Sequence, residues 1–314
     1  MEWEEAHKSA QSMLAGVESI RLRGGRSKQL SEIEIAGLDW GGDGPLIVLH
    51  HANGFCAASL GEVASRLRKQ YRVISIDARG HGDSTPVDPS TDPDAYSWWT
   101  LAQDAECALE SILSRTGHDR AELVIGHSFG GALMLAAATR RPELFARLLL
   151  CDPVIFPSLN KGEMPTPPDG GNRLVEATLR RRNLFPSHAD AFAHCASRGL
   201  FANFTPASLA LYVGEGMRQT EQGEVTLKCA REVEAAIFAT GGTLDLTDDV
   251  GRVTAEVRIV HAQQGNFSRP VYERLVAQMS SGQVESVDAG HLFPLEKPEL
   301  VLSRVEEMMG RVAS

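Results

Sequence analysis

The sequence predicts an α/β fold in which a mostly parallel sheet is flanked by helices and interrupted by a helical cap. Short apolar segments, typical of buried parallel strands, alternate with longer helical segments over most of the chain. This alternation stops between about residues 153 and 245, where the sequence is first rich in proline and glycine and then helical. We therefore predict a core formed by residues 1–152 and 250–314, and a cap formed by residues 153–249.

The individual elements follow from local hydrophobic patterns. Residues 31–37 alternate apolar and polar side chains, which predicts a half-exposed edge strand. Further strands are predicted at 45–51, 71–77, 121–128, 146–152, 255–262 and 283–289. Helices are predicted near 58–70, 98–115, 270–280 and 298–312, and directly after Ser128. Because helices separate the strands, the strands should run parallel, with helices on both faces of the sheet.

The charge balance excludes some kinds of partner. The 314 residues include 31 basic and 41 acidic ones, a formal net charge of -10. A nucleic-acid interface needs a clustered basic face, and the one dense basic run, Arg180–Arg182, is short and is typical of a solvated helix face. No apolar run approaches the roughly 20 residues that span a bilayer. We therefore expect neither a nucleic-acid partner nor a membrane span, and the sequence carries no signal for the oligomeric state.

The cysteines and the first residues bear on the compartment. The five cysteines are widely spaced, odd in number and without a C-x-x-C pair, which argues against a disulfide framework and a structural zinc site. Scattered free thiols are typical of a reducing compartment. The first residues are acidic and polar, unlike a secretory signal. We expect a cytoplasmic protein.

The strongest chemical signal is the run Gly126-His127-Ser128-Phe129-Gly130. It fits the pattern G-x-S-x-G, follows a predicted strand and opens a predicted helix. A serine on such a sharp turn needs small neighbours, and the helix N-terminus supplies free backbone N–H groups beside it. We predict Ser128 as a nucleophile. The alternative is a glycine-rich turn whose serine only caps the helix.

The candidate base is His291, which follows Gly290 after the predicted strand 283–289. It lies in a loop at the carboxyl end of a strand, the edge where open α/β sheets place their sites. In the alternative interpretation, His291 only caps the following turn.

Acyl transfer needs two N–H donors that face the developing oxyanion. One donor should be the backbone of Phe129, directly after the nucleophile. The other should be Asn53, through its backbone or its side-chain amide, in the run His51-Ala52-Asn53-Gly54-Phe55 that ends the first buried strand. The alternative for this run is an ordinary turn rich in turn-forming residues.

With the run Asp77-Ala78-Arg79-Gly80-His81-Gly82-Asp83-Ser84, these motifs resemble the α/β-hydrolase superfamily over about residues 31–152 and 250–312. The resemblance implies the α/β-hydrolase fold, with the cap inserted after the sixth strand. Nucleophile first and base last is also the family's chain order. Ala52 stands where the family usually has glycine in the motif His-Gly-x-Pro.

The triad acid departs from the commoner family pattern. Relatives often carry an aspartate in the loop after the seventh strand, but residues 261–267 contain no carboxylate. Some relatives carry the acid after the sixth strand, where Asp152 ends an apolar segment. An ionised carboxylate there needs a partner, and His291 is the natural one. We predict Asp152 as the acid, with Asn266 as the alternative residue that orients His291.

These residues predict a serine hydrolase that cleaves carboxylic esters, lactones or related acyl compounds, without a metal or organic cofactor. A serine at position 128 excludes the alkyl-ester chemistry of relatives with an aspartate nucleophile, such as haloalkane dehalogenases and epoxide hydrolases. A cofactor-independent C–C bond hydrolase or a perhydrolase remains an alternative. A non-catalytic ligand-binding protein on the same fold is a further alternative.

The cap should determine the substrate, a small acyl compound. Its apolar side chains predict an apolar pocket, although at least half of them are expected to form the cap's own core. These residues are Phe156, Leu184, Phe185, Phe192, Phe201, Phe204, Leu211 and Tyr212. His188 and His194 lack the spacing of a metal site and have no assigned role.

Overall fold

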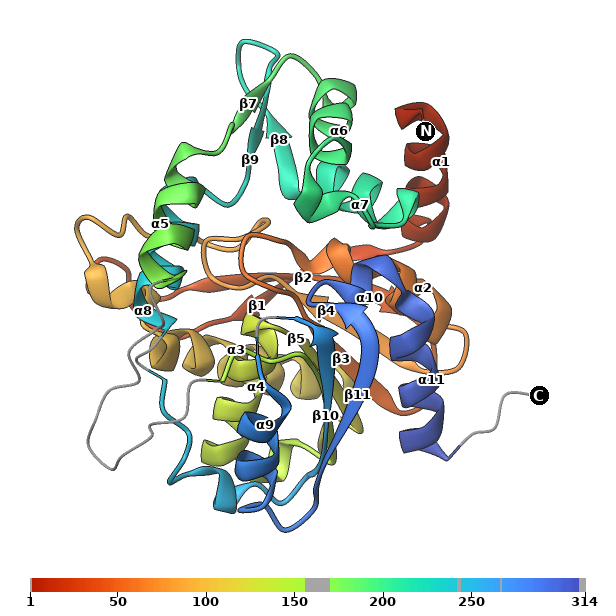
Figure 1. Cartoon of the computed structure of the whole chain (residues 1–314), viewed down its shortest axis with the longest axis vertical. Helices are drawn as coiled ribbons and strands as arrows, with labels where there is room; N and C mark the ends of the chain where they lie inside the picture. The colour runs from red at the N-terminus through yellow and green to blue at the C-terminus, as the bar shows by residue number, and fades with distance from the viewer. Residues whose placement is uncertain (1, 156–169, 242–243, 266, 311–314) are drawn as a thin grey trace.

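The computed structural model describes residues 2–155, 170–241, 244–265 and 267–310. Its centre is an eight-stranded sheet in the order β1-β2-β4-β3-β5-β6-β10-β11 (Figure 1). The strands are β1 (Glu18–Arg23), β2 (Glu34–Gly41), β3 (Leu46–His50), β4 (Arg72–Ile76), β5 (Leu123–His127), β6 (Arg147–Cys151), β10 (Glu256–Gln264) and β11 (Gly282–Gly290). Strands β3 to β6, β10 and β11 pair in parallel, as predicted.

The edge of the sheet differs from the prediction. The predicted edge strand, residues 31–37, corresponds to β2, which lies between β1 and β4 and pairs antiparallel with both. The edge is β1, which buries Ile20 and Leu22 and exposes the residues between and around them. Because β1 has few apolar residues among many charged ones, its alternation is weak in the sequence.

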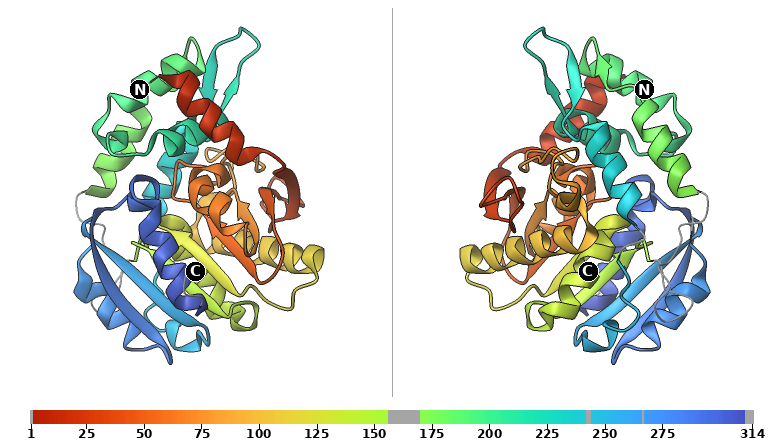
Figure 2. Two further views of the ribbon diagram at one scale, coloured as in Figure 1. Left: turned by 90° about the vertical axis from the view of Figure 1, so that its right-hand side faces the viewer. Right: turned by 90° about the vertical axis from the view of Figure 1, so that its left-hand side faces the viewer.

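Helices cover both faces of the sheet (Figure 2). On one face, α3 (Trp98–Thr116), α4 (Phe129–Arg140) and α9 (Arg269–Val276) share a buried cluster with alternate strand residues such as Val48 and Leu148. On the other face, α2 (Gly61–Leu67) and α11 (Pro298–Met309) pack on Leu49, Leu149 and their neighbours. Strands buried on both faces explain the continuous apolar segments of the sequence.

The segment after β6 forms the predicted helical cap. Its helices are α5 (Gly170–Arg180), α6 (His188–Ala196), α7 (Pro206–Gly216) and α8 (Arg231–Thr240). It also holds a small antiparallel sheet that the sequence analysis did not predict, formed by β7 (Leu184–Phe185), β9 (Val225–Leu227) and β8 (Met217–Gln219). These strands have two or three residues each, which is too short for an alternating pattern to be visible.

The cap and the N-terminal helix lie together above the core. Helix α1 (Trp3–Leu14) lies beside α6 and α7 (Figure 1), and the Trp3 ring stacks on His188. Phe204 and Tyr212 of the cap share a buried cluster with Phe55, from the loop after β3, and with Leu292, from the loop after β11. The cap therefore covers the carboxyl ends of the parallel strands, where the predicted site residues lie. Phe156 lies outside the described residues.

Candidate active site

Ser128 lies on a sharp turn between β5 and α4. Its backbone has φ 56° and ψ -118°, a conformation that costs energy for a residue with a side chain. Its N–H donates to the Cys151 carbonyl at 2.9 Å, which holds the turn against β6. A Cβ at Gly126 would lie 2.6 Å from the Gly131 Cα, and one at Gly130 would lie 2.5 Å from the His51 carbonyl oxygen. The glycines of the motif are therefore required by close approach of the backbone.

Three predicted residues meet at this turn. The Ser128 Oγ lies 2.8 Å from Nε2 of His291, and Nδ1 of the same ring lies 2.6 Å from Oδ2 of Asp152. With the proton on Nδ1, the ring donates to the carboxylate and accepts from the serine hydroxyl. Ser128 and Asp152 are buried, and His291 is partly exposed. The arrangement can therefore pass a proton from the serine to the histidine while the aspartate holds the ring.

Asp152 is held on its other oxygen as well. It directly follows β6 and has φ 42°. Its Oδ1 accepts from the Ala262 N–H at 3.1 Å and from the Tyr272 hydroxyl at 3.2 Å, and that hydroxyl also donates to the Pro153 carbonyl at 2.8 Å. These contacts fix the orientation of the carboxylate towards His291. Asn266, the alternative to Asp152, lies outside the described residues. Tyr272 was missed by the sequence analysis because it lies on α9, 120 positions from Asp152.

His127 is a second residue that the sequence analysis did not assign. Its Nε2 lies 2.9 Å from the backbone oxygen of His291, so an N–H there fixes the loop that carries the base. Burial lowers the pKa of His127 to about 3, so the ring is neutral at ordinary pH. His127 is thus suited to positioning the His291 loop.

The two expected oxyanion donors have different settings. Phe129 is the first residue of α4, where a backbone N–H has no carbonyl within the helix to bind. The side chain of Asn53 is anchored: its Nδ2 donates to the Glu234 carbonyl at 3.1 Å, and its Oδ1 lies 3.1 Å from the His81 ring. Because an amide nitrogen carries two N–H groups, the side chain and the backbone N–H of Asn53 both stay predicted donors.

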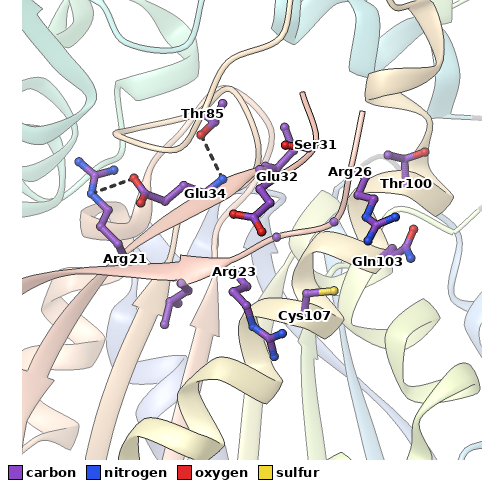
Figure 3. A pocket seen from close by; sticks show the side chains of 14 residues that line it. Arg21, Arg23, Arg26, Ser31, Glu32, Glu34, Thr85, Thr100, Gln103 and Cys107 are labelled. Carbon is purple, nitrogen blue, oxygen red and sulfur yellow. Dashed lines mark hydrogen bonds and ion pairs between the residues drawn. The ribbon is translucent and has the colours of Figure 1, made fainter. Parts of the chain in front are cut away.

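A surface hollow lies away from this site, along β1, the segment 24–34 and α3 (Figure 3). Arg21, Arg23 and Cys107 are among the residues that line it, and Arg21 forms an ion pair with Glu34 there. Ser128, Asp152 and His291 are not part of its lining. The candidate active site is therefore the cluster of Ser128, His291 and Asp152, and not this surface hollow.

The described ranges hold neither a candidate metal cluster nor a candidate membrane-spanning helix. Within them, no group of three or more His, Cys, Asp or Glu residues could hold a metal ion. His188 instead stacks on Trp3, and His194 contacts the Phe185 ring. No helix in the same ranges is both long and apolar enough to cross a membrane.

A mostly parallel sheet with a serine on a strand-to-helix turn, beneath a cap that follows the sixth strand, defines a protein of the α/β-hydrolase class. The sequence profile of the Alpha/beta hydrolase family matches residues 47–304, and the chain belongs to that family.

Individual relatives agree with this assignment. Lipase LipV of Mycobacterium tuberculosis is 26% identical over 254 residues, which cover 80% of this chain and 89% of the lipase. Protein phosphatase methylesterase 1 of Mus musculus is 32% identical over 114 residues, but these cover 35% of this chain and 28% of the relative. The crystal structure of E-2-(acetamidomethylene)succinate hydrolase superposes with a TM-score of 0.75 over 94% of this chain and 99% of that chain, at 21% identity. At that identity the superposition supports the fold alone.

Proposed function

We propose that this protein is a serine hydrolase that cleaves carboxylic esters, lactones or related acyl compounds through an acyl-enzyme intermediate. The observation that carries the proposal is the hydrogen-bonded chain from Ser128 Oγ through His291 to Asp152, with distances of 2.8 and 2.6 Å. A serine hydroxyl is a weak nucleophile unless a base removes its proton, and this geometry supplies the base.

The proposed reaction has two halves. In the first, His291 Nε2 takes the Ser128 proton while the oxygen attacks the acyl carbon, and the N–H groups of Phe129 and Asn53 stabilise the oxyanion. The leaving group departs with the proton from His291. In the second half, His291 removes a proton from water, whose oxygen attacks the acyl carbon. The bond to Ser128 Oγ then breaks, Oγ takes the proton back from His291, and the acid is released. Asp152 keeps the ring in the Nδ1–H tautomer and stabilises the imidazolium.

The relatives' names support an ester as the bond cleaved. A lipase matches most of the chain and a methylesterase matches about a third of it. The five cysteines are free, which supports a reducing compartment, and we propose the cytoplasm.

A panel of p-nitrophenyl esters of increasing acyl length, with lactones and amides added, tests the proposal. We expect hydrolysis of at least one ester or lactone and loss of that hydrolysis in Ser128→Ala, on the order of a million-fold in kcat. Ser12→Ala is the matched control, because Ser12 is exposed on α1 and should be neutral. A folded Ser128→Ala variant that keeps a tenth of the activity would refute the mechanism.

A further inference from the structure

The basic run Arg180–Arg182 is not the solvated helix face that its sequence suggests. The Arg180 side chain is 75% exposed and pairs with Glu176, and Arg182 lies over the Phe185 ring. The Arg181 side chain is only 25% exposed and points among buried residues. Helix α5 ends at Arg180, so the chain turns there and Arg181 leaves the exposed face of the helix.

The Arg181 guanidinium is incompletely satisfied. Its Nη2 lies 2.9 Å from Oε2 of Glu234 on α8, but the two groups are not aligned as a hydrogen bond. Among the described residues, Nε and Nη2 of Arg181 and Oε2 of Glu234 are buried without a hydrogen-bond partner. A buried ion pair that serves only the fold needs its remaining donors and acceptors satisfied, because each one left open costs free energy. Two of these atoms still face each other in the ion pair, so Nε of Arg181 is the donor that has no partner among the described residues.

The other groups around Arg181 do not balance its charge. They include the thiols of Cys195 and Cys229 and the phenol of Tyr212. Burial raises the pKa of Cys195 to about 11 and moves the pKa values of the other two upward as well, so all three are neutral at ordinary pH. Among the described residues, Glu234 is thus the one carboxylate that pairs with the Arg181 guanidinium.

The pair lies against the loop that carries the proposed oxyanion donor. Asn53 donates its side-chain N–H to the Glu234 carbonyl. A Cβ at Gly54 would lie 2.6 Å from Oε1 of Glu234, so the carboxylate rests directly on this residue. Because Gly54 has φ +81° as well, a side chain is excluded there by conformation and by space. Arg181 is therefore linked through Glu234 to the loop that carries the proposed oxyanion donor.

We propose that Arg181 binds a carboxylate of the substrate, so that this hydrolase acts on esters or related acyl compounds that carry an acid group in addition to the bond cleaved. The proposal rests on the proposed function. Nε has no partner, and Nη2 has only the unaligned ion pair with Glu234. These two atoms lie on the same edge of the guanidinium, and such an edge can bind both oxygens of a carboxylate in parallel. Glu234 holds the guanidinium in place and, by its own charge, weakens the affinity for the incoming acid.

The test compares esters that differ only in a free acid. Acid release is followed by pH-stat for the monomethyl and dimethyl esters of succinic, glutaric and adipic acids, which carry the acid on the acyl side. The O-acetyl derivatives of glycolic and 3-hydroxypropionic acids, with their methyl esters, carry it on the alcohol side. We expect kcat/KM for at least one free acid to exceed that of its methyl-capped partner by about 10- to 100-fold, the range for a hydrogen bond between charged groups.

Variants assign that preference to Arg181. Arg181→Met should remove it by lowering kcat/KM for the acid while changing that of the capped ester less than about threefold. Arg180→Met, from the same basic run but exposed, should keep the wild-type preference. Glu234→Gln removes the competing negative charge and should increase the preference. If Arg181→Met does not fold, as judged by thermal unfolding, the wild type and Glu234→Gln decide the question.

Three outcomes would overturn the proposal: no acid preferred in the wild type, a preference that persists in folded Arg181→Met, or one that is unchanged or lower in Glu234→Gln. Calorimetric titration of Ser128→Ala with monomethyl and dimethyl glutarate separates this inference from the proposed function. If the wild type hydrolyses nothing in either panel, the proposed function fails. Tighter binding of the free acid would then still support the Arg181 site, and equal binding would contradict it.

Discussion

Nδ1 of His291 lies 2.6 Å from Oδ2 of Asp152, the residue that directly follows β6. This pairing joins two strand ends that are 139 positions apart in the chain. Residues 261–267 contain no carboxylate, and His261 of β10 bonds instead to Ser286 and to the Phe267 carbonyl. The histidine is thus oriented from the end of β6, and the proposed mechanism depends on that relationship.

We predict that Asp152→Asn keeps the fold but lowers kcat by about 10⁴-fold at neutral pH. The amide would stabilise the wrong tautomer of His291, so that Nε2 could no longer accept the serine proton. Steady-state kinetics on the best ester measure the loss, and circular dichroism checks the fold.

Tyr272→Phe is the matched control for Asp152→Asn. It removes the hydrogen bonds of the hydroxyl to Oδ1 and to the Pro153 carbonyl but leaves the carboxylate and His291 in place, so activity should fall far less than in Asp152→Asn. Asn266→Ala should also cost much less. A loss in Asn266→Ala equal to that in Asp152→Asn would assign the orienting role to Asn266.

We predict that Gly130→Ala destabilises the protein and removes activity. The new Cβ would lie 2.5 Å from the His51 carbonyl oxygen and 2.6 Å from Nδ1 of His50, so backbone would have to move at the serine turn. Gly199→Ala is the control, because a Cβ at Gly199 meets nothing within 4 Å. The midpoint of thermal unfolding should fall by several degrees in the first variant only, and equal midpoints would contradict the packing argument.

The buried His50 predicts a pH dependence of stability. Burial lowers the pKa of His50 to about 4, whereas an unfolded histidine titrates near 6.5. The stabilisation is therefore fully present above pH 6.5 and is lost as the pH falls towards 4, because only the unfolded chain takes up the proton. Between pH 6.5 and 4, uptake of this proton by the unfolded chain lowers the free energy of unfolding by roughly 1 kcal/mol for each unit by which the pH falls.

Urea unfolding of the wild type and of His50→Gln at several pH values between 7 and 4 measures this effect. The variant should lose less stability than the wild type as the pH falls, by about the slope of one proton. The pH profile of the wild type must be compared with that of the variant, because Asp77 acts in the opposite direction in both proteins. Burial raises the pKa of Asp77 to about 7, so protonation of this carboxyl increases the stability as the pH falls. Parallel pH profiles would show that His50 does not titrate on unfolding.

Most of the core could be predicted from local motifs. The same motifs predicted that three site residues lie close together. Ser128 lies in a contiguous glycine motif, and His291 and Asp152 each directly follow an apolar strand. In a parallel sheet such positions meet at one edge, which is why their proximity follows from the sequence.

The features that escaped prediction depend on distant contacts or on short segments. Tyr272 and His127 contact the site through partners more than a hundred positions away. Arg181 is partly buried because its helix ends one residue earlier, which the spacing of a basic run does not reveal. Likewise half of the residues in β1 are charged, and β7 has only two residues.

The most direct test of the account is the covalent labelling of the folded protein by a fluorophosphonate, with the adduct located by peptide mass spectrometry. The account predicts one adduct per chain on Ser128, slowed strongly by Asp152→Asn and absent in Ser128→Ala, whereas Ser12→Ala labels like the wild type. A folded sample that forms no adduct, as a ligand-binding protein without turnover would, or an adduct on a different serine, would contradict the assignment of Ser128 as the nucleophile.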